Sequence, residues 1–237
     1  ISITKKKNKI KITSPSFDIS SDIEKSLKDT KDANIFKIFE NFNSQISLNI
    51  KLARLDDNYY FNNFNGIVEI KNSKINNVNL SAKFKRGGIF NYTKDKLDGS
   101  KVTIVYSDHA KPFVKKFDFI KGFEDGKLDY TSTQFKNNTE KSELRIYDFK
   151  LKDMPVLTKL LSLASLQGIA DLATGEGIRF NEFEMFFENS KNLIKINEIY
   201  ALGPAISILM EGYVEKNKLV SLRGTLVPAT TINRSIA

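Results

Sequence analysis

The segment SQISLNIKL at Ser44–Leu52 decides the fold class of this 237-residue chain. Apolar side chains occupy every second position from Ile46 onward, and polar side chains occupy the positions between them. Successive side chains of a β-strand point to opposite faces, so this period of two predicts a strand with one apolar and one polar face. Such a strand suits an antiparallel sheet that is buried on one side only.

The same alternation recurs along most of the chain, and turn residues separate the repeats. Turns are predicted at Asn62–Gly66, Arg86–Gly88 and Lys94–Ser100. Many short strands joined by brief loops predict a mainly β fold, an antiparallel meander with inserted helices. The predicted strands are Ile1–Thr13 (one or two strands), Ile46–Leu52, Val68–Ile70, Val78–Phe84, Ile89–Tyr92, Val102–Tyr106, Lys127–Phe135, Glu143–Leu151, Ile178–Phe187, Leu193–Tyr200, Ala205–Val214 and Leu219–Val227.

Helical patterns interrupt the strands at three places. Ile35, Phe36 and Phe39 within Ala33–Asn43 have helical spacing, and Ser107-Asp108 can cap a helix over His109–Phe119. The third segment, Asp153–Gly175, begins with a capping residue type, carries proline in its first turn and ends at the glycine.

This third helix, near 153–173, is apolar nearly all round, so it must be buried or lie against lipid. It can plug the concavity of the sheet, line a lipid path or insert into a membrane. Lys159, Gln167 and Asp171 disfavour insertion because polar groups are costly in hydrocarbon. We therefore expect a helical plug formed by Leu157, Leu160, Leu161, Leu163, Leu166 and Ile169.

The net charge of +9 leaves two interpretations open. Anion binding would suit nucleic acid or a membrane surface, but the lysines are spread along the chain. The dense run within Lys5–Lys11 alternates into a predicted edge strand, where lysines also prevent aggregation. We expect solvated faces and no nucleic-acid partner.

No catalytic pattern emerges from the sequence. His109 is the single histidine and cysteine is absent, which excludes a multi-histidine or thiolate metal site. Ser107-Asp108-His109 contains triad residue types, but adjacency in sequence does not give triad geometry. Gly175-Glu176-Gly177 lacks the other positions of a nucleotide-binding loop. The sequence therefore predicts a protein that is not an enzyme and has no catalytic residue, cofactor or metal.

Four motifs in the second half occur together in a distinctive order. The motifs are ELRIYDFKLKDMPVLTKLLSLASL (Glu143–Leu166), GIADLATGEGIRFNEFEMFFE (Gly168–Glu188), IYALGPAISILMEGYV (Ile199–Val214) and LRGTLVPATTIN (Leu222–Asn233). Through them, the stretch Val102–Ala237 resembles the AsmA-like C-terminal region of the YhdP/TamB/AsmA group of bacterial envelope proteins, which are bridge-like lipid transfer proteins. The first hundred residues match that region only in being a β-meander.

The resemblance implies a single AsmA-like β-groove domain over residues 1–237, a piece of a longer chain. It implies a curved sheet, taco-like or half-barrel, in the periplasmic part of an inner-membrane-anchored protein. The implied function is phospholipid transport between inner and outer membranes, with acyl chains as the partners. Expected groove residues are Ile46, Leu48, Ile50, Val78, Leu80, Phe84, Val102, Ile104, Phe183, Met185 and Phe187.

An alternative keeps the same strands but closes their apolar face. The chain would then be a structural or assembly module for outer-membrane biogenesis, with the apolar face as an ordinary core. A third hypothesis assigns anion or polysaccharide binding to the lysine-rich faces. The sequence identifies no partner protein and does not fix the lipid or the direction of its transport.

Overall fold

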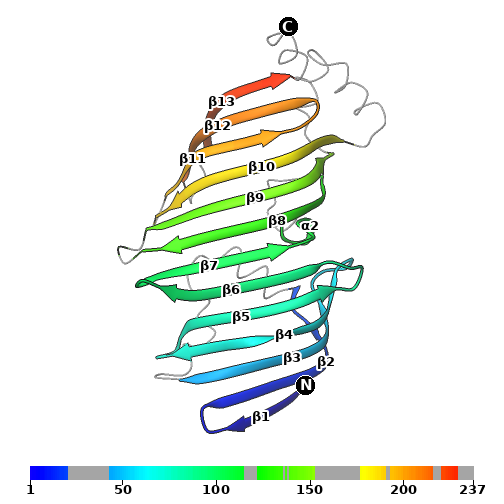
Figure 1. Ribbon diagram of the computed structural model, residues 1–237, viewed down its shortest axis with the longest axis vertical. Helices are drawn as coiled ribbons and strands as arrows, with labels where there is room; N and C mark the ends of the chain where they lie inside the picture. The colour runs from blue at the N-terminus through cyan, green and yellow to red at the C-terminus, as the bar shows by residue number, and fades with distance from the viewer. Residues whose placement is uncertain are drawn as a thin grey trace. The chain divides into compact units, whose positions relative to one another are not determined.

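The computed structural model confirms a mainly β protein with strands throughout the described part of the chain (Figure 1). It describes residues 1–20, 43–114, 122–135, 137, 139–152, 177–190, 193–215 and 220–228. The chain divides into two compact units, Ile1–Asp108 (unit 1) and His109–Ala237 (unit 2). The single-domain assignment stays a prediction.

Unit 1 contains a sheet whose strands follow one another in chain order. Neighbouring strands are antiparallel except β2 and β3, which are parallel and joined through residues 21–42, outside the described range. This pair departs from the expected meander, because a connection of that length can return the chain to the same end of the sheet. The strands are β1 (Ser2–Lys6), β2 (Lys9–Asp18), β3 (Ser44–Arg54), β4 (Tyr60–Lys71), β5 (Lys74–Phe84), β6 (Ile89–Leu97) and β7 (Ser100–Ser107).

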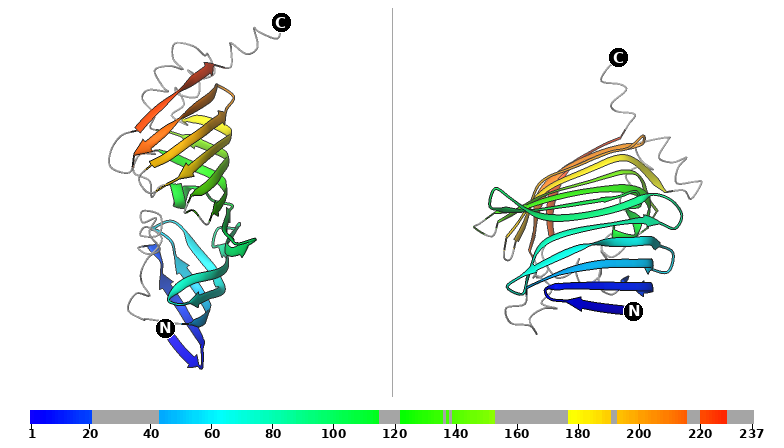
Figure 2. Two further views of the ribbon diagram at one scale, coloured as in Figure 1. Left: turned by 90° about the vertical axis from the view of Figure 1, so that its left-hand side faces the viewer. Right: turned by 60° about the horizontal axis from the view of Figure 1, so that its bottom comes forward.

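Unit 2 begins with a short helix and continues as an antiparallel meander. Within each unit the described strands make one open layer, and Figure 2 shows that this layer is curved. The elements are α2 (Lys111–Val114), β8 (Phe123–Gln134), β9 (Glu140–Leu151), β10 (Ile178–Asn189), β11 (Leu193–Leu202), β12 (Ile206–Glu215) and β13 (Val220–Pro228).

The turn predicted at Asn62–Gly66 is wrong, because these residues lie inside β4. The chain turns earlier, between Arg54 and Tyr60, where the Asp56 carboxylate accepts hydrogen bonds from the N–H groups of Asn58 and Tyr59 at 2.8 Å each. Asparagine and glycine suggested a turn, but here Asn63 has φ 52° and shifts the register of β4 against β5. It is therefore a β-bulge residue.

The hairpin between β6 and β7 is tighter than the predicted Lys94–Ser100 connection. Only Asp98 and Gly99 separate the strands, with φ values of 50° and 80°. Positive φ at both central residues is the geometry that an Asp-Gly hairpin turn adopts. The predicted turn at Arg86–Gly88 is confirmed between β5 and β6.

The helix predicted over His109–Phe119 begins later than expected, at Lys111. The carbonyl of Ala110 accepts hydrogen bonds from the N–H groups of Phe113 and Val114, so Ala110 stands where the first turn starts. The Asp108 carboxylate instead accepts a hydrogen bond from the Ile89 N–H at 2.7 Å. Residues 115–121, and the helices predicted over 33–43 and 153–173, lie outside the described residues, save Asn43.

Candidate functional site

Unit 1 has one apolar and one polar face, and the strand register defines both. Residues directly opposite on paired strands share a face. Leu48 of β3 lies opposite Gly66 of β4, which lies opposite Leu80 of β5. The row Asn49, Asn65, Ser81 and Asn91 runs over the other, polar face. The apolar face of unit 1 comprises Ile10, Ile12, Ile46, Leu48, Ile50, Phe61, Phe64, Val68, Val78, Leu80, Ala82, Phe84, Phe90, Tyr92 and Val105.

Two predicted groove residues, Val102 and Ile104, lie on the polar face and not with the others. Ile104 pairs with Thr93, whereas its neighbour Val105 pairs with Tyr92, the partner of Leu80. Ile104 also leaves 49% of its surface exposed. The stretch VTIVY has apolar residues in both phases of the strand, so its alternation does not identify the inner face.

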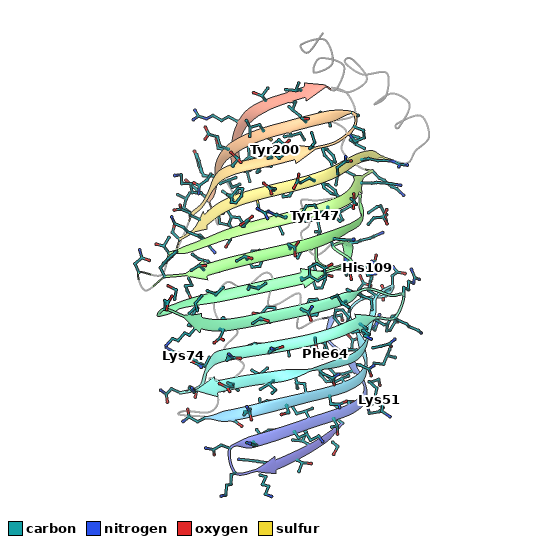
Figure 3. All side chains as sticks on the ribbon, in the orientation of Figure 1. Lys51, Phe64, Lys74, His109, Tyr147 and Tyr200 are labelled. Carbon is teal, nitrogen blue, oxygen red and sulfur yellow. The ribbon has the colours of Figure 1, made fainter. Side chains whose placement is uncertain are left out.

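An aromatic cluster occupies one part of this apolar face. The ring centroid of Phe61 lies 5.9 Å from that of Phe64, 4.7 Å from that of Phe84 and 4.9 Å from that of Phe90. The cluster depends on the bulge at Asn63, which brings Phe61 and Phe64 to one face although they are three residues apart. Figure 3 labels Phe64 on β4.

The remaining predicted groove residues of unit 1 differ in how deeply they are buried. Ile50, Val78 and Phe84 are buried in the fold itself, with 4%, 5% and 3% of their surfaces exposed. Ile46 and Leu48 on β3, like Leu80 on β5, are half-buried on the same face. The half-buried side chains are the ones that a bound molecule can reach.

Unit 2 repeats the division into an apolar and a polar face. Phe183, Met185 and Phe187 of β10 all lie on the apolar face and are half-buried. Two apolar rows run across the strands, the first over β8–β13 and the second over β9–β12. One is Leu128, Ile146, Phe183, Ala201, Ile208 and Leu226, and the other runs through Leu144, Met185, Ile199 and Met210.

Phe149 is the centre of an aromatic stack on this face. Its ring centroid lies 5.2 Å from that of Phe123 and 5.2 Å from that of Phe180, with interplanar angles of 14° and 12°. The preceding residue, Asp148, has φ 54°. In each unit, therefore, a residue with left-handed backbone conformation lies within a strand beside a cluster of phenylalanines.

The opposite face of unit 2 carries charged and polar side chains. Arg145 of β9 lies 2.5 Å from a carboxylate oxygen of Glu143 and 2.7 Å from one of Glu184 on β10. Tyr147 and Tyr200, labelled in Figure 3, belong to this face through their pairing with glutamates of β10. Charged and polar side chains therefore cover one face of unit 2, and mostly apolar side chains cover the other face.

A group of polar side chains, here called the polar corner, interrupts the apolar face of unit 2 near the β8–β9 hairpin. The Ser132 hydroxyl donates a hydrogen bond to the Glu140 carboxylate, and the Tyr130 and Ser142 hydroxyls lie 3.2 Å apart. Ser132 and Ser142 expose only 2% and 6% of their surfaces. Asn189 of β10 completes the polar corner.

Burial raises the pKa of the Tyr130 phenol, and hydrogen bonding to Ser142 and Ser132 partly offsets the rise. The phenol is therefore protonated near neutral pH and can donate a hydrogen bond. The polar corner was not predicted from the sequence, because its members lie in three strands and only their register brings them together.

The plug residues Leu157, Leu160, Leu161, Leu163, Leu166 and Ile169 lie outside the described residues. Within the described ranges, no cluster of His, Asp or Glu side chains could hold a metal ion. No helix in those ranges has the length and hydropathy to cross a membrane.

Comparisons of the chain with protein-family models, curated proteins and solved structures find no match.

Proposed function

We propose that this chain handles phospholipid acyl chains without catalysis, on the apolar faces of its two units. The observation that carries the proposal is the row Leu144, Met185, Ile199 and Met210, which continues across four strands of half-buried apolar side chains. Hydrocarbon gains about 0.8 kcal/mol for each CH₂ group that leaves water. A face of aliphatic and phenylalanine side chains therefore suits acyl chains without polar recognition.

The sequence motifs extend the proposal to a family and a location. We propose that the chain is an AsmA-like region and the periplasmic part of an inner-membrane-anchored envelope protein. Lipid would then pass between inner and outer membranes in a groove formed by the curved sheet. The open strand order and the one-sided apolar pattern support a groove of this kind, because a lipid groove needs an apolar inner face and a polar, solvent-exposed outer face.

A structural or assembly role is the second candidate, and the burial of Phe61 and Phe84 favours it for part of unit 1. These side chains expose 0% and 3% of their surfaces and already contact other rings of the protein. We therefore assign the aromatic cluster, with Ile50 and Val78, to the core. Lipid contact is proposed for the half-buried residues alone.

Photocrosslinking tests the proposal with neighbours that point to opposite faces. A photoreactive residue replaces Leu80 or Met185 on the apolar faces, and Asn79 or Glu184 provides the matched polar-face control. After exposure to phospholipid vesicles, we expect lipid adducts at the first two positions and not at the controls. Equal labelling at all four positions, or no labelling at any of them, would overturn the proposal.

A further inference from the structure

The polar corner lies where the apolar rows of unit 2 end. Ser132, Ser142 and Phe187 form one row across the strands, and Gln134, Glu140 and Asn189 form the next row outward. Tyr130 belongs to the adjoining apolar row through its pairing with Leu144. An amphiphile with its chains along the apolar rows would therefore meet this group at its polar end.

The hydrogen-bonding capacity of the polar corner is incompletely used. Glu140 accepts a hydrogen bond from Ser132, and the Asn189 amide nitrogen lies 3.4 Å from its other oxygen. Among the residues that the structure describes, none forms a hydrogen bond with the buried side-chain oxygen of Asn189. A buried acceptor left unpaired costs about 1–3 kcal/mol, so a turn of the Asn189 side chain that brings this oxygen to an arriving donor is favoured.

The charge of Glu140 also lacks a cation among the described residues. Lys141, the next residue, forms its ion pair with Glu188 at 3.6 Å, and both belong to the polar face. A carboxylate accepts several hydrogen bonds, and those from charged donors are the strongest. The polar corner therefore presents one negative charge and spare acceptor oxygens beside hydrocarbon.

We propose that the polar corner binds the head of a phospholipid that carries a primary ammonium group. This inference rests on the proposed lipid-handling function and names its preferred substrate class. The ammonium donates hydrogen bonds to Glu140 and to the unpaired oxygen of Asn189, while the acyl chains lie toward Leu144 and Met185. A head with only a phosphate negative charge is disfavoured, because Glu140 repels it.

Competition between two phospholipids tests the preference. The chain is incubated with vesicles of equal phosphatidylethanolamine and phosphatidylglycerol with identical acyl chains, then separated, and bound lipid is quantified by mass spectrometry. We expect phosphatidylethanolamine in roughly tenfold excess, the ratio that a charge-assisted hydrogen bond provides. The net charge of +9 favours the anionic lipid, so it cannot produce this excess.

Two glutamate variants locate the effect. Glu140→Gln should abolish the excess, whereas Glu188→Gln should retain it, although both variants change the net charge equally. Asn189→Leu keeps the net charge and should lower the phosphatidylethanolamine excess several-fold, because it removes the unpaired acceptor. This variant tests the inference if Glu140→Gln does not fold.

The outcomes separate the inference from the proposed function. If both lipids bind in equal amounts, or if Glu188→Gln removes the preference as fully as Glu140→Gln, the head-group inference is wrong and lipid handling stands. If neither lipid binds the unmodified chain, lipid handling and the head-group inference both fail.

Discussion

Gly66 lies where the backbone of β5 leaves no space for a side chain. A Cβ atom at this position would stand 2.1 Å from the carbonyl oxygen of Asn79 and 2.8 Å from the Cα atom of Leu80. Because these are backbone atoms, β4 and β5 would have to move apart. We expect Gly66→Ala to lower the free energy of unfolding by about 1–3 kcal/mol, measured by urea denaturation.

Ser81→Ala in the adjacent strand is the control for Gly66→Ala. Ser81 is exposed on the polar face, so its substitution should change stability by no more than about 0.5 kcal/mol. Equal stability of the two variants would contradict the close approach of β4 and β5.

Asn63 tests the bulge in the same strand. Its φ of 52° suits asparagine or glycine but opposes a β-branched side chain. We expect Asn63→Val to cost about 1–2 kcal/mol and Asn63→Gly to cost little, in thermal and urea unfolding. Asn91→Val, at an exposed position of the extended strand β6, should be neutral or stabilising. A neutral Asn63→Val would show that β4 does not need the bulge.

Asn63 and Gly66 also show why the sequence predicted a turn where the structure has a strand. Asn63 and Gly66 have the composition of a turn, but in β4 one provides a bulge and the other a close strand contact. Composition alone does not distinguish these roles from a turn, because turns also favour residues that tolerate positive φ, such as asparagine, and residues without a side chain, such as glycine. Asp98-Gly99, by contrast, carries the local signal of a two-residue hairpin and could have been predicted.

At the scale of the strand, Leu80 and Ile104 provide the sharpest comparison. Leu80 is half-buried on the apolar face of unit 1, whereas Ile104 is exposed on the opposite face. We expect Leu80→Asn to remain folded by circular dichroism but to bind less lipid, measured by mass spectrometry, because unit 1 loses part of its apolar face. Ile104→Asn should retain both its fold and its bound lipid.

The buried neighbour Val78 completes this comparison. Val78→Asn places an amide where 5% of the side chain is exposed, and should cost a few kcal/mol of stability. If Leu80→Asn unfolds the protein as Val78→Asn does, the apolar face is a closed core and the groove proposal for unit 1 fails.

Strand alternation predicted most of the apolar faces because each strand with a single apolar phase has one possible inner side. Leu48 and Phe183 illustrate this, since polar neighbours flank each of them. Val102 and Ile104 were misplaced because β7 is apolar in both phases. The polar corner was missed because residues 132, 140 and 189 meet only through the pairing of three strands.

At the scale of the whole chain, each unit has its own aromatic cluster. Phe61 contacts other phenylalanines of unit 1, and Phe149 is stacked between Phe123 and Phe180 of unit 2. Truncating a buried phenylalanine removes about 3–5 kcal/mol of stability. The loss should spread through the cooperative unit that contains the residue, because regions of a protein can open with separate free energies.

We therefore expect Phe61→Ala to accelerate amide hydrogen exchange in peptides from Ile1–Asp108 and Phe149→Ala to accelerate it in peptides from His109–Ala237, with exchange followed by mass spectrometry. Phe135→Ala, at a position 40% exposed, is the control and should change exchange little in either unit. If each buried substitution accelerates exchange equally along the whole chain, the two units unfold as one cooperative body. A substitution on either apolar face would then lower the free energy of unfolding of both units, and lipid binding at one unit would stabilise the other.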